Sequence, residues 1–512
     1  MLDARSSVAC SSAGARASAG LVRALLGPAT GYAFPDEPTW SEATIRLIES
    51  EDASIADEGY RLRVDPTHVE VSARTTAGMA NALQTLRQLL PPAIYAPGPV
   101  PGRWAVPAVD IEDAPRFSWR GAMLDVSRHF FPISSLLRFV DLCAMCKLNV
   151  VQLHLNDDQG WRFGSERYPR LVEVGAWRRE TRIGHKWDRS RDRDFDGTPH
   201  GGFYTKDQLR ALVAYAHQRN VTLVPEIDLP GHAQAAIAAY PEFGGVGPLE
   251  VWTTWGVSDH VLAISDATLA FACDLWDEVL EVFPSTYVHI GGDECPREEW
   301  RRSPAMQARM AELKLQGPDG LQHLFTSALC EHLVRAGRRP VGWDEIIDGG
   351  ELPKGATVMS WRGMRGGIVA AEAGFDVVMC PQDPCYFDHY QSDGSTEPLA
   401  IGGLNTLEDV YAFEPVPTAL EGRKAAHVLG TQLQLWSEYL PEARDVEYMA
   451  FPRAVALAEV AWQAAPRDLS DFKRRLSAHL ERLDVLGVNY RPLDGPRPWQ
   501  QGGSGPRRRF DR

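Results

Sequence analysis

The pattern of apolar and polar positions changes near residue 116, so two domains are expected. Upstream of it, residues 60–64 and 69–73 alternate apolar and polar side chains, as half-buried strands do, and the polar residues 65–68 form a turn between them. Residues 76–90 then repeat Met79, Leu83 and Leu86 at helical spacing. Strands followed by a helix predict a small α+β accessory domain over residues 21–115.

Downstream of residue 116, short apolar runs alternate with helical patterns. Eight of these runs predict strands: Ala122–Val126, Val150–Leu155, Thr222–Glu226, Thr286–Ile290, Arg339–Gly342, Thr357–Ser360, Asp376–Met379 and His427–Gln432. One helix is expected after Pro132, and a capping box at Thr205–Gln208 opens another. Eight strand–helix repeats over residues 116–494 predict a (β/α)8 TIM barrel, which would be the catalytic domain of an α/β protein.

Three segments lack periodic patterns. Residues 1–20 are small, polar and aperiodic, and residues 495–512 are rich in Gly and Arg, so both ends are predicted to be disordered. The polar, glycine-containing stretch 181–203 is too long for an ordinary barrel connection. Because long loops of such barrels usually lie on the active-site face, we expect this loop to border the site.

Composition narrows the classes of partner. The chain has 512 residues, of which 44% are hydrophobic and 24% charged, and its formal charge is −15. A net negative charge disfavours binding to nucleic acid or to anionic membranes, because both favour a basic face. No apolar run is long enough to predict a membrane span, and no basic segment precedes an apolar core, so a cytoplasmic location is expected.

The eight cysteines do not predict a metal or redox site. They are scattered along the chain, and no pair has the spacing of a zinc site. Cys143 and Cys146 have the CxxC spacing, but they lie in an apolar helical pattern, which favours two core thiols. No metal and no cofactor are expected.

Polar side chains follow the predicted strands at their carboxyl ends. The most informative segment is His289–Glu294 (HIGGDE), in which two glycines permit a sharp turn and two adjacent acids follow a buried strand. Comparable residues follow the other strands: Asp125, Asp157, Asp158, Glu226, Asp228, His232, Trp343, Asp344, Glu345, Trp361, Arg362, Tyr386, Asp388, Trp436 and Glu438. The carboxyl ends of barrel strands meet at one mouth, so these residues predict a single site.

The adjacent acids indicate a particular form of glycoside cleavage. Cleavage needs an acid for the leaving oxygen and a second group that stabilises an oxocarbenium-like centre. Because Asp293 and Glu294 are neighbours in the sequence, they are poorly arranged to act as an acid and a nucleophile on opposite sides of the glycosidic bond. Their arrangement suits a substrate that supplies its own nucleophile, such as a 2-acetamido group.

From residue 21 to about residue 492 the chain resembles the β-N-acetylhexosaminidases of glycoside hydrolase family 20. The most specific segments are Trp119–Phe131 (WRGAMLDVSRHFF), His154–Arg162 (HLNDDQGWR), Glu226–His232 (EIDLPGH) and His289–Glu294. The resemblance implies a retaining exo-β-N-acetylhexosaminidase that removes terminal, non-reducing N-acetylglucosamine or N-acetylgalactosamine through an oxazolinium intermediate. β-Linked N-acetylhexosaminides, such as chitooligosaccharides or glycoconjugates, would be its substrates.

The same resemblance implies catalytic roles. Glu294 would be the general acid and base, Asp293 would orient the acetamido N–H, and Tyr386 would donate to the acetamido oxygen. His232 and either Asp157 or Asp158, of which Asp157 is preferred, would form a relay that positions Glu294.

Further residues would bind the sugar. Trp343, Trp361 and Trp436 would wall the acetyl pocket and the sugar face. Arg120 would bind the hydroxyls at positions 3 and 4, while Asp388 and Glu438 would bind those at 4 and 6. In this family the accessory domain usually begins with a strand upstream of residues 21–31, and no such strand is predicted in residues 1–20.

Three alternatives compete with this interpretation. A non-catalytic sugar-binding barrel would keep Arg120 and the tryptophan walls but lose Asp293 or Glu294. A metal-dependent hydrolase could use His154, Asp157, Asp228 and His232 as ligands, although no motif such as HExxH supports it. A glycosidase of the same fold could act on other amino sugars. The natural substrate, the preference between gluco and galacto epimers, and the oligomeric state stay open.

Overall fold

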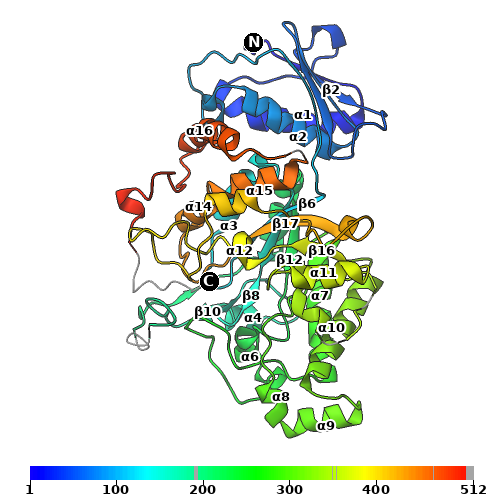
Figure 1. Ribbon diagram of the computed structural model, residues 1–512, viewed down its shortest axis with the longest axis vertical. Coiled ribbons are helices and arrows are strands. Elements are labelled where there is room, and N and C mark those ends of the chain that lie inside the picture. Colours follow the sequence, from blue (N-terminus) through cyan, green and yellow to red (C-terminus); the bar gives the residue numbers. More distant parts are fainter. Residues whose placement is uncertain (189–193, 349, 353, 465, 503–512) are drawn as a thin grey trace.

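A closed barrel of eight parallel strands forms the centre of the computed structural model (Figure 1). The structure describes residues 1–188, 194–348, 350–352, 354–464 and 466–502. The barrel strands, in chain order, are β6 (Trp119–Asp125), β7 (Val150–His154), β12 (Thr222–Glu226), β13 (Tyr287–His289), β14 (Arg339–Trp343), β15 (Thr357–Ser360), β16 (Asp376–Met379) and β17 (Val428–Leu435). β17 pairs with β6 and closes the barrel. All eight predicted strands and the TIM barrel are confirmed.

The barrel strands are buried on both faces, because side chains fill the interior and helices cover the outside. Every residue of β6 and β7 is buried. The main covering helices are α3 (Ile133–Met145), α5 (Lys206–His217), α7 (Asp266–Leu280), α10 (Pro318–Arg335), α11 (Arg365–Glu372) and α15 (Arg453–Trp462). As predicted, Thr205 caps α5, and its side chain accepts the backbone N–H of Gln208.

Shorter elements lie in the connections. The helices are α4 (Arg170–Glu173), α6 (Gln234–Ala239), α8 (Glu298–Arg302), α9 (Pro304–Glu312), α12 (Gln382–Cys385), α13 (Leu407–Ala412) and α14 (Ala443–Ala450), followed at the end of the barrel domain by the longer α16 (Leu469–Val485). Two small ribbons pair β8 (Asn156–Asp157) with β9 (Gly160–Trp161) and β10 (Trp177–Arg178) with β11 (His200–Gly201). Residues 189–193 of the predicted loop lie outside the described residues.

The accessory domain is a five-stranded mixed sheet with two helices. Its sheet order is β1-β2-β4-β3-β5, from β1 (Val8–Cys10), β2 (Ile45–Glu49), β3 (Tyr60–Val64), β4 (Val69–Ala73) and β5 (Val109–Asp113). Its helices are α1 (Ala13–Thr30) and α2 (Thr76–Leu89), which pack against each other. The predicted α+β class, the strands at 60–64 and 69–73 and the helix after them are therefore confirmed.

The prediction of disorder for residues 1–20 is wrong. β1 pairs in parallel with β2, and α1 begins at Ala13 with Ser12 as its N-cap. Small side chains such as Ala15 and Ala19 are buried here. They allow close packing but carry little hydrophobic signal, and a three-residue strand is too short to show a period. The strand that appeared to be missing upstream of residue 21 is β1.

The predicted C-terminal tail is partly ordered. Residues 498–500 form a short 3-10 helix, and the buried Gln500 side chain donates to Asn489 Oδ1 at 2.8 Å and to the Tyr490 carbonyl at 2.9 Å. The prediction is wrong for this stretch, and residues 503–512 lie outside the described residues. Among the described helices none has the length and apolar character needed to cross a membrane.

Arg120 joins the two domains instead of facing the barrel mouth. It is fully buried near the amino end of β6 and forms a two-point ion pair with Glu58 of the accessory domain, at 2.5 and 3.2 Å. It also donates to the carbonyls of Phe117 and Lys147, at 2.7 and 2.9 Å. In Figure 1 the accessory domain lies at one end of the molecule, and α8 and α9, which follow the HIGGDE turn, lie at the other.

Candidate active site

A cavity of about 990 Å³ opens at the carboxyl end of the barrel strands. This volume suits a small-molecule ligand. The predicted residues that line it are Asp293, Glu294, Trp361, Tyr386, Asp388, Trp436 and Glu438. Arg128 and Lys186, which were not predicted, line it as well, so the predicted loop 181–203 borders the site through Lys186. Seven predicted residues from four different strand ends therefore meet in one cavity.

The turn after β13 places two acids at the cavity. Gly291 and Gly292 have φ values of 68° and 98°, and a Cβ at Gly291 would lie 1.8 Å from Asp228 Oδ1. That oxygen accepts the Gly292 N–H at 2.9 Å. Glu294 itself has a φ of 42°, a costly conformation for a residue with a side chain. The turn is therefore built on glycine and on the Asp228 carboxylate, and it stores strain at Glu294.

The two adjacent acids occupy different environments. Asp293 is 7% exposed, whereas the side chain of Glu294 is 44% exposed. Burial, together with the neighbouring Asp228 carboxylate, raises the pKa of Asp293 well above its usual value. One acid therefore faces the dry interior of the cavity and the other its rim.

His232 lies between these acids and Asp157. Its Nε2 is 3.8 Å from Asp293 and 3.7 Å from Glu294, and its Nδ1 is 3.1 Å from Asp157. Asp158 is more distant, at 3.6 Å, and accepts two backbone N–H groups of nearby loops instead. Burial alone would lower the pKa of His232, but the surrounding carboxylates raise it well above its usual value. The geometry agrees with the choice of Asp157.

Asp157 is itself held by cations. Its Oδ2 lies 2.8 Å from Arg128 Nη2 and 2.8 Å from His154 Nε2. Burial would raise the pKa of Asp157, but Arg128 and His232 hold it well below its usual range. Asp157 is therefore an ionised, fully buried carboxylate.

Aromatic rings form the walls of the cavity. Tyr386 stacks on Trp361, with ring centroids 6.2 Å apart and planes 17° apart, and Trp436 lies 6.3 Å from Tyr386. Burial raises the pKa of Tyr386 well above its usual value, so its hydroxyl stays protonated and can donate. Trp343 lies one layer deeper: it is fully buried, packs 5.8 Å from Trp436 and donates its indole N–H to Glu226.

Two further acids, Asp388 and Glu438, line the cavity. Asp388 is 4% exposed, and among the described residues its Oδ1 has no hydrogen-bond partner. Burial and the nearby Glu438 raise the pKa of Asp388 well above its usual value. Burial also raises the pKa of Glu438, although Arg128 opposes this. A buried carboxylate oxygen that lacks a protein donor, as Asp388 Oδ1 does among the described residues, is suited to accept the hydroxyl of a sugar.

The prediction of Arg120 as a sugar ligand is wrong, and Arg128 takes the position at the cavity. Arg120 lies near the amino end of β6, while Arg128 follows its carboxyl end, where barrel active sites lie. Arg128 donates to Gln159 Oε1 at 3.1 Å, and its guanidinium lies 5.1 Å from the Trp436 ring centroid. The predicted strand begins at Ala122, so Arg120 precedes it and lies at the amino end, away from the barrel mouth.

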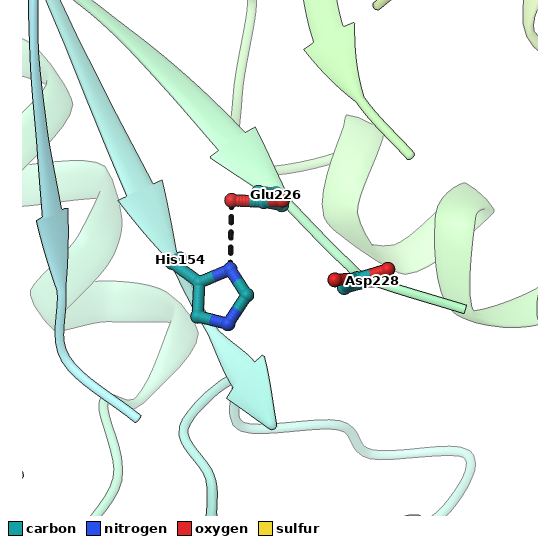
Figure 2. Close-up of side chains that lie close together, drawn as sticks. All are labelled: His154, Glu226 and Asp228. Carbon is teal, nitrogen blue, oxygen red and sulfur yellow. Dashed lines mark ion pairs between the residues drawn. The ribbon is translucent and has the colours of Figure 1, made fainter. Parts of the chain in front are cut away.

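Several potential metal ligands lie together below the cavity. His154, Glu226 and Asp228 form one such cluster, and Asp228, His232 and Asp293 form another. Figure 2 shows that His154 and Glu226 point toward each other, joined by an ion pair of 2.8 Å, while Asp228 lies to one side. In the first cluster His154 and Glu226 pair with each other. The absence of a metal requirement stays a prediction, for which activity in the presence of a chelator is the test.

Comparison with known proteins identifies the family. Residues 117–465 match the catalytic domain of glycosyl hydrolase family 20, and residues 1–114 match domain 2 of that family. The chain belongs to glycosyl hydrolase family 20. It is therefore a glycoside hydrolase of the β-hexosaminidase kind.

Named relatives and solved structures agree with this assignment. The chain is 43% identical over 455 residues to a β-hexosaminidase of Porphyromonas gingivalis, a match that covers 88% of the chain and 56% of that longer relative. It is 33% identical over 462 residues to a β-hexosaminidase of Akkermansia muciniphila, which covers 88% of the chain and 90% of the relative.

Among solved structures, the β-N-acetylhexosaminidase of Streptomyces coelicolor is similar with a TM-score of 0.82 and 33% identity, covering 97% of this chain and 95% of that one. The Streptomyces plicatus enzyme in complex with thio-NAglucal matches with a TM-score of 0.82 and 34% identity, covering 97% and 94%.

The two arginines of the WRGAMLDVSRHFF segment can be separated by substitution. Arg120→Gln should lower the melting temperature, because it leaves Glu58 unpaired at the domain junction, while kcat/KM of the folded enzyme stays within about threefold. Arg128→Gln should lower kcat/KM by about 100-fold, since hydrogen bonds to charged groups contribute about 1.5–3 kcal/mol each. Thermal melts and kinetics with an aryl N-acetylglucosaminide test both. The opposite assignment of the two effects would contradict the structure.

Asp388→Asn should stabilise the free protein at neutral and alkaline pH. The folded pKa of Asp388 is raised, so this group favours folding below the ordinary aspartate pKa, and that contribution is lost as the pH rises through the folded pKa. The amide removes this loss. The melting temperature should therefore exceed that of the wild type at pH 8 by roughly 1 °C per kcal/mol recovered, from an unfolding entropy of about 2.1 cal/mol/K per residue, with little difference at pH 4 and with weaker substrate binding. A lower melting temperature at pH 8 would count against it.

Proposed function

We propose that the protein is a retaining exo-β-N-acetylhexosaminidase that removes terminal, non-reducing N-acetylglucosamine or N-acetylgalactosamine by substrate-assisted catalysis. The observation that carries the proposal is the unequal placement of two neighbouring acids, Asp293 in the dry interior and Glu294 at the rim. Two acids on one turn can act on different atoms of one sugar. This arrangement suits a substrate whose own acetamido group is the nucleophile.

In the first step Glu294 gives its proton to the glycosidic oxygen. The acetamido oxygen of the same sugar attacks the anomeric carbon, the bond to the leaving group breaks, and a bicyclic oxazolinium ion forms. Asp293 accepts the acetamido N–H and, in the ionised form that a neighbouring positive charge favours, stabilises the charge of this ion. Because attack occurs within one molecule, it gains a large effective molarity.

In the second step the Glu294 carboxylate takes a proton from water, which attacks the anomeric carbon and opens the ring of the intermediate. Two successive inversions give overall retention. Tyr386 is placed to donate its protonated hydroxyl to the acetamido oxygen, while Trp361 and Trp436 wall the sugar. Arg128, Asp388 and Glu438 are available for the ring hydroxyls. A structural relative from Streptomyces plicatus binds the product GlcNAc, which supports this class of substrate.

Glu294→Gln tests the acid role. Its kcat/KM should fall by about 100- to 10,000-fold for N,N′-diacetylchitobiose, whose leaving group needs protonation. The loss should be much smaller for 2,4-dinitrophenyl N-acetylglucosaminide, whose leaving group departs without it. The measurement is kcat/KM of the variant and of the wild type on both substrates. Equal losses on both, or none, would remove Glu294 from this role.

Asp293→Asn tests the assistance by the substrate. The amide cannot stabilise a cationic oxazolinium ion as a carboxylate does, so kcat should fall by about 100-fold or more on N-acetylated substrates. On aryl glucosides, which lack the acetamido group, any residual activity should change much less. A loss of the same size on both substrate types would argue against the acetamido mechanism. The same panel, extended to N-acetylgalactosaminides, measures the epimer preference.

A further inference from the structure

His154 lies below the cavity between two carboxylates. Its Nε2 is 2.8 Å from Asp157 Oδ2, and its Nδ1 is 2.8 Å from Glu226 Oε2, the ion pair drawn in Figure 2. An imidazole that faces a carboxylate with each nitrogen carries a proton on both and is a cation. Burial alone would lower the pKa of His154, but Glu226 and Asp157 raise it well above its usual value.

Glu226 is the fixed end of this arrangement. It accepts the side-chain N–H of Gln152 at 2.8 Å and the indole N–H of Trp343 at 2.9 Å, and it pairs with His289 Nδ1 at 3.1 Å. These partners stand on three different barrel strands, β7, β14 and β13. A carboxylate held from three strands of a closed barrel cannot turn without disturbing the barrel itself.

The contacts continue from His154 to the mouth of the barrel. Arg128 and His154 occupy Asp157 Oδ2, while Oδ1 accepts the backbone N–H of Asp158 at 2.7 Å and faces His232 Nδ1 at 3.1 Å. The other nitrogen of His232 then faces Glu294 at 3.7 Å. The His154 ring also meets the Trp436 ring edge-to-face, at 4.9 Å and 79°, directly beneath the cavity wall.

We propose that His154, anchored by Glu226, is a positioning residue for the general acid, in a chain that runs Glu226–His154–Asp157–His232–Glu294. The proposal rests on the proposed function of Glu294. His154 transfers no proton to the substrate. It holds Asp157 in the one rotamer that presents Oδ1 to His232, and so keeps His232 directed at Glu294. Loss of His154 removes one of the partners that hold Asp157 Oδ2, so the orientation of the acid is weakened before the sugar loses its contacts.

The variant His154→Gln tests this chain. Glutamine has a similar length and one N–H donor group, but it has no charge and cannot bridge both carboxylates as an imidazolium does. It should lower kcat/KM for N,N′-diacetylchitobiose by about 10- to 100-fold, part of the 100- to 10,000-fold contributed by acid–base catalysis. For 2,4-dinitrophenyl N-acetylglucosaminide the loss should stay within about threefold. His154→Gln should therefore discriminate between the two substrates in the same direction as Glu294→Gln, but with a smaller loss of kcat/KM on N,N′-diacetylchitobiose.

A matched control is Gln434→Met, because Gln434 is another fully buried polar side chain of the barrel interior, and it contacts Gln432, Met359 and Cys380. Gln434→Met should cause only a small change in kcat/KM, and the change should be the same for both substrates. If His154→Gln lowered activity equally on the two substrates, as the control does, the positioning role would be overturned.

A double variant separates positioning from folding. His154→Gln leaves Glu226 short of a cation, so the melting temperature should fall. Adding Glu226→Gln removes the excess buried charge, and the melting temperature should rise again while the chitobiose-specific loss of kcat/KM persists. Recovery of chitobiose hydrolysis together with stability would overturn the proposal, since His154 would then be only a charge partner. Failure of the wild type on both substrates would instead contradict the proposed function.

Discussion

The site depends on Asp157, a fully buried carboxylate that three cations hold in place. Arg128 and His154 share one of its oxygens, and His232 approaches the other. Without these partners a buried carboxylate would take up a proton, because burial in a medium of low polarity is costly for an isolated charge. With them it stays ionised and fixes the direction of each ring. Arg128, which lines the cavity, and His232, which faces the acids, are thus oriented by one group.

Three of the acids that line the cavity are buried. Asp293, Asp388 and Glu438 are buried, and burial raises the pKa of each. A fold selected for stability alone would pair such groups or replace them. Their positions next to Trp436 and Tyr386, in a cavity that opens to solvent, fit an enzyme that binds hydroxyl and amide groups of a sugar. The cost in stability of the free protein is then a consequence of function.

The barrel could be predicted from sequence because its strands are apolar on both faces. Three of the eight strands, at 222–226, 357–360 and 376–379, have the predicted bounds. The residues lining the mouth could be predicted where they directly follow such a strand, as Trp361 and Trp436 do. The prediction for Arg120 failed because it came from the family resemblance and not from the strand pattern: Arg120 lies at the amino end of β6, opposite the site, with the predicted start at Ala122 as with the observed start at Trp119. The pattern of apolar and polar residues does not show which way a side chain points within a short strand. The deeper position of Trp343 could therefore not be predicted from the sequence.

The N-terminal segment shows a different limit. Its helix α1 contains many Ala, Ser and Gly residues, so its sequence has the composition of a disordered end, yet Val22, Leu26 and Ala29 are almost completely buried. Small residues let α1 approach α2 closely, and that contact exists only in the folded domain. The accessory domain in turn meets the barrel through the Arg120–Glu58 pair, near the amino ends of the strands. In barrels of this kind residues at that end serve stability, while those at the carboxyl ends serve chemistry. A change at the junction should therefore affect folding and leave the geometry around Asp157 intact. All five residues of the series of contacts that runs from Glu226 through His154, Asp157 and His232 to Glu294 belong to the barrel domain.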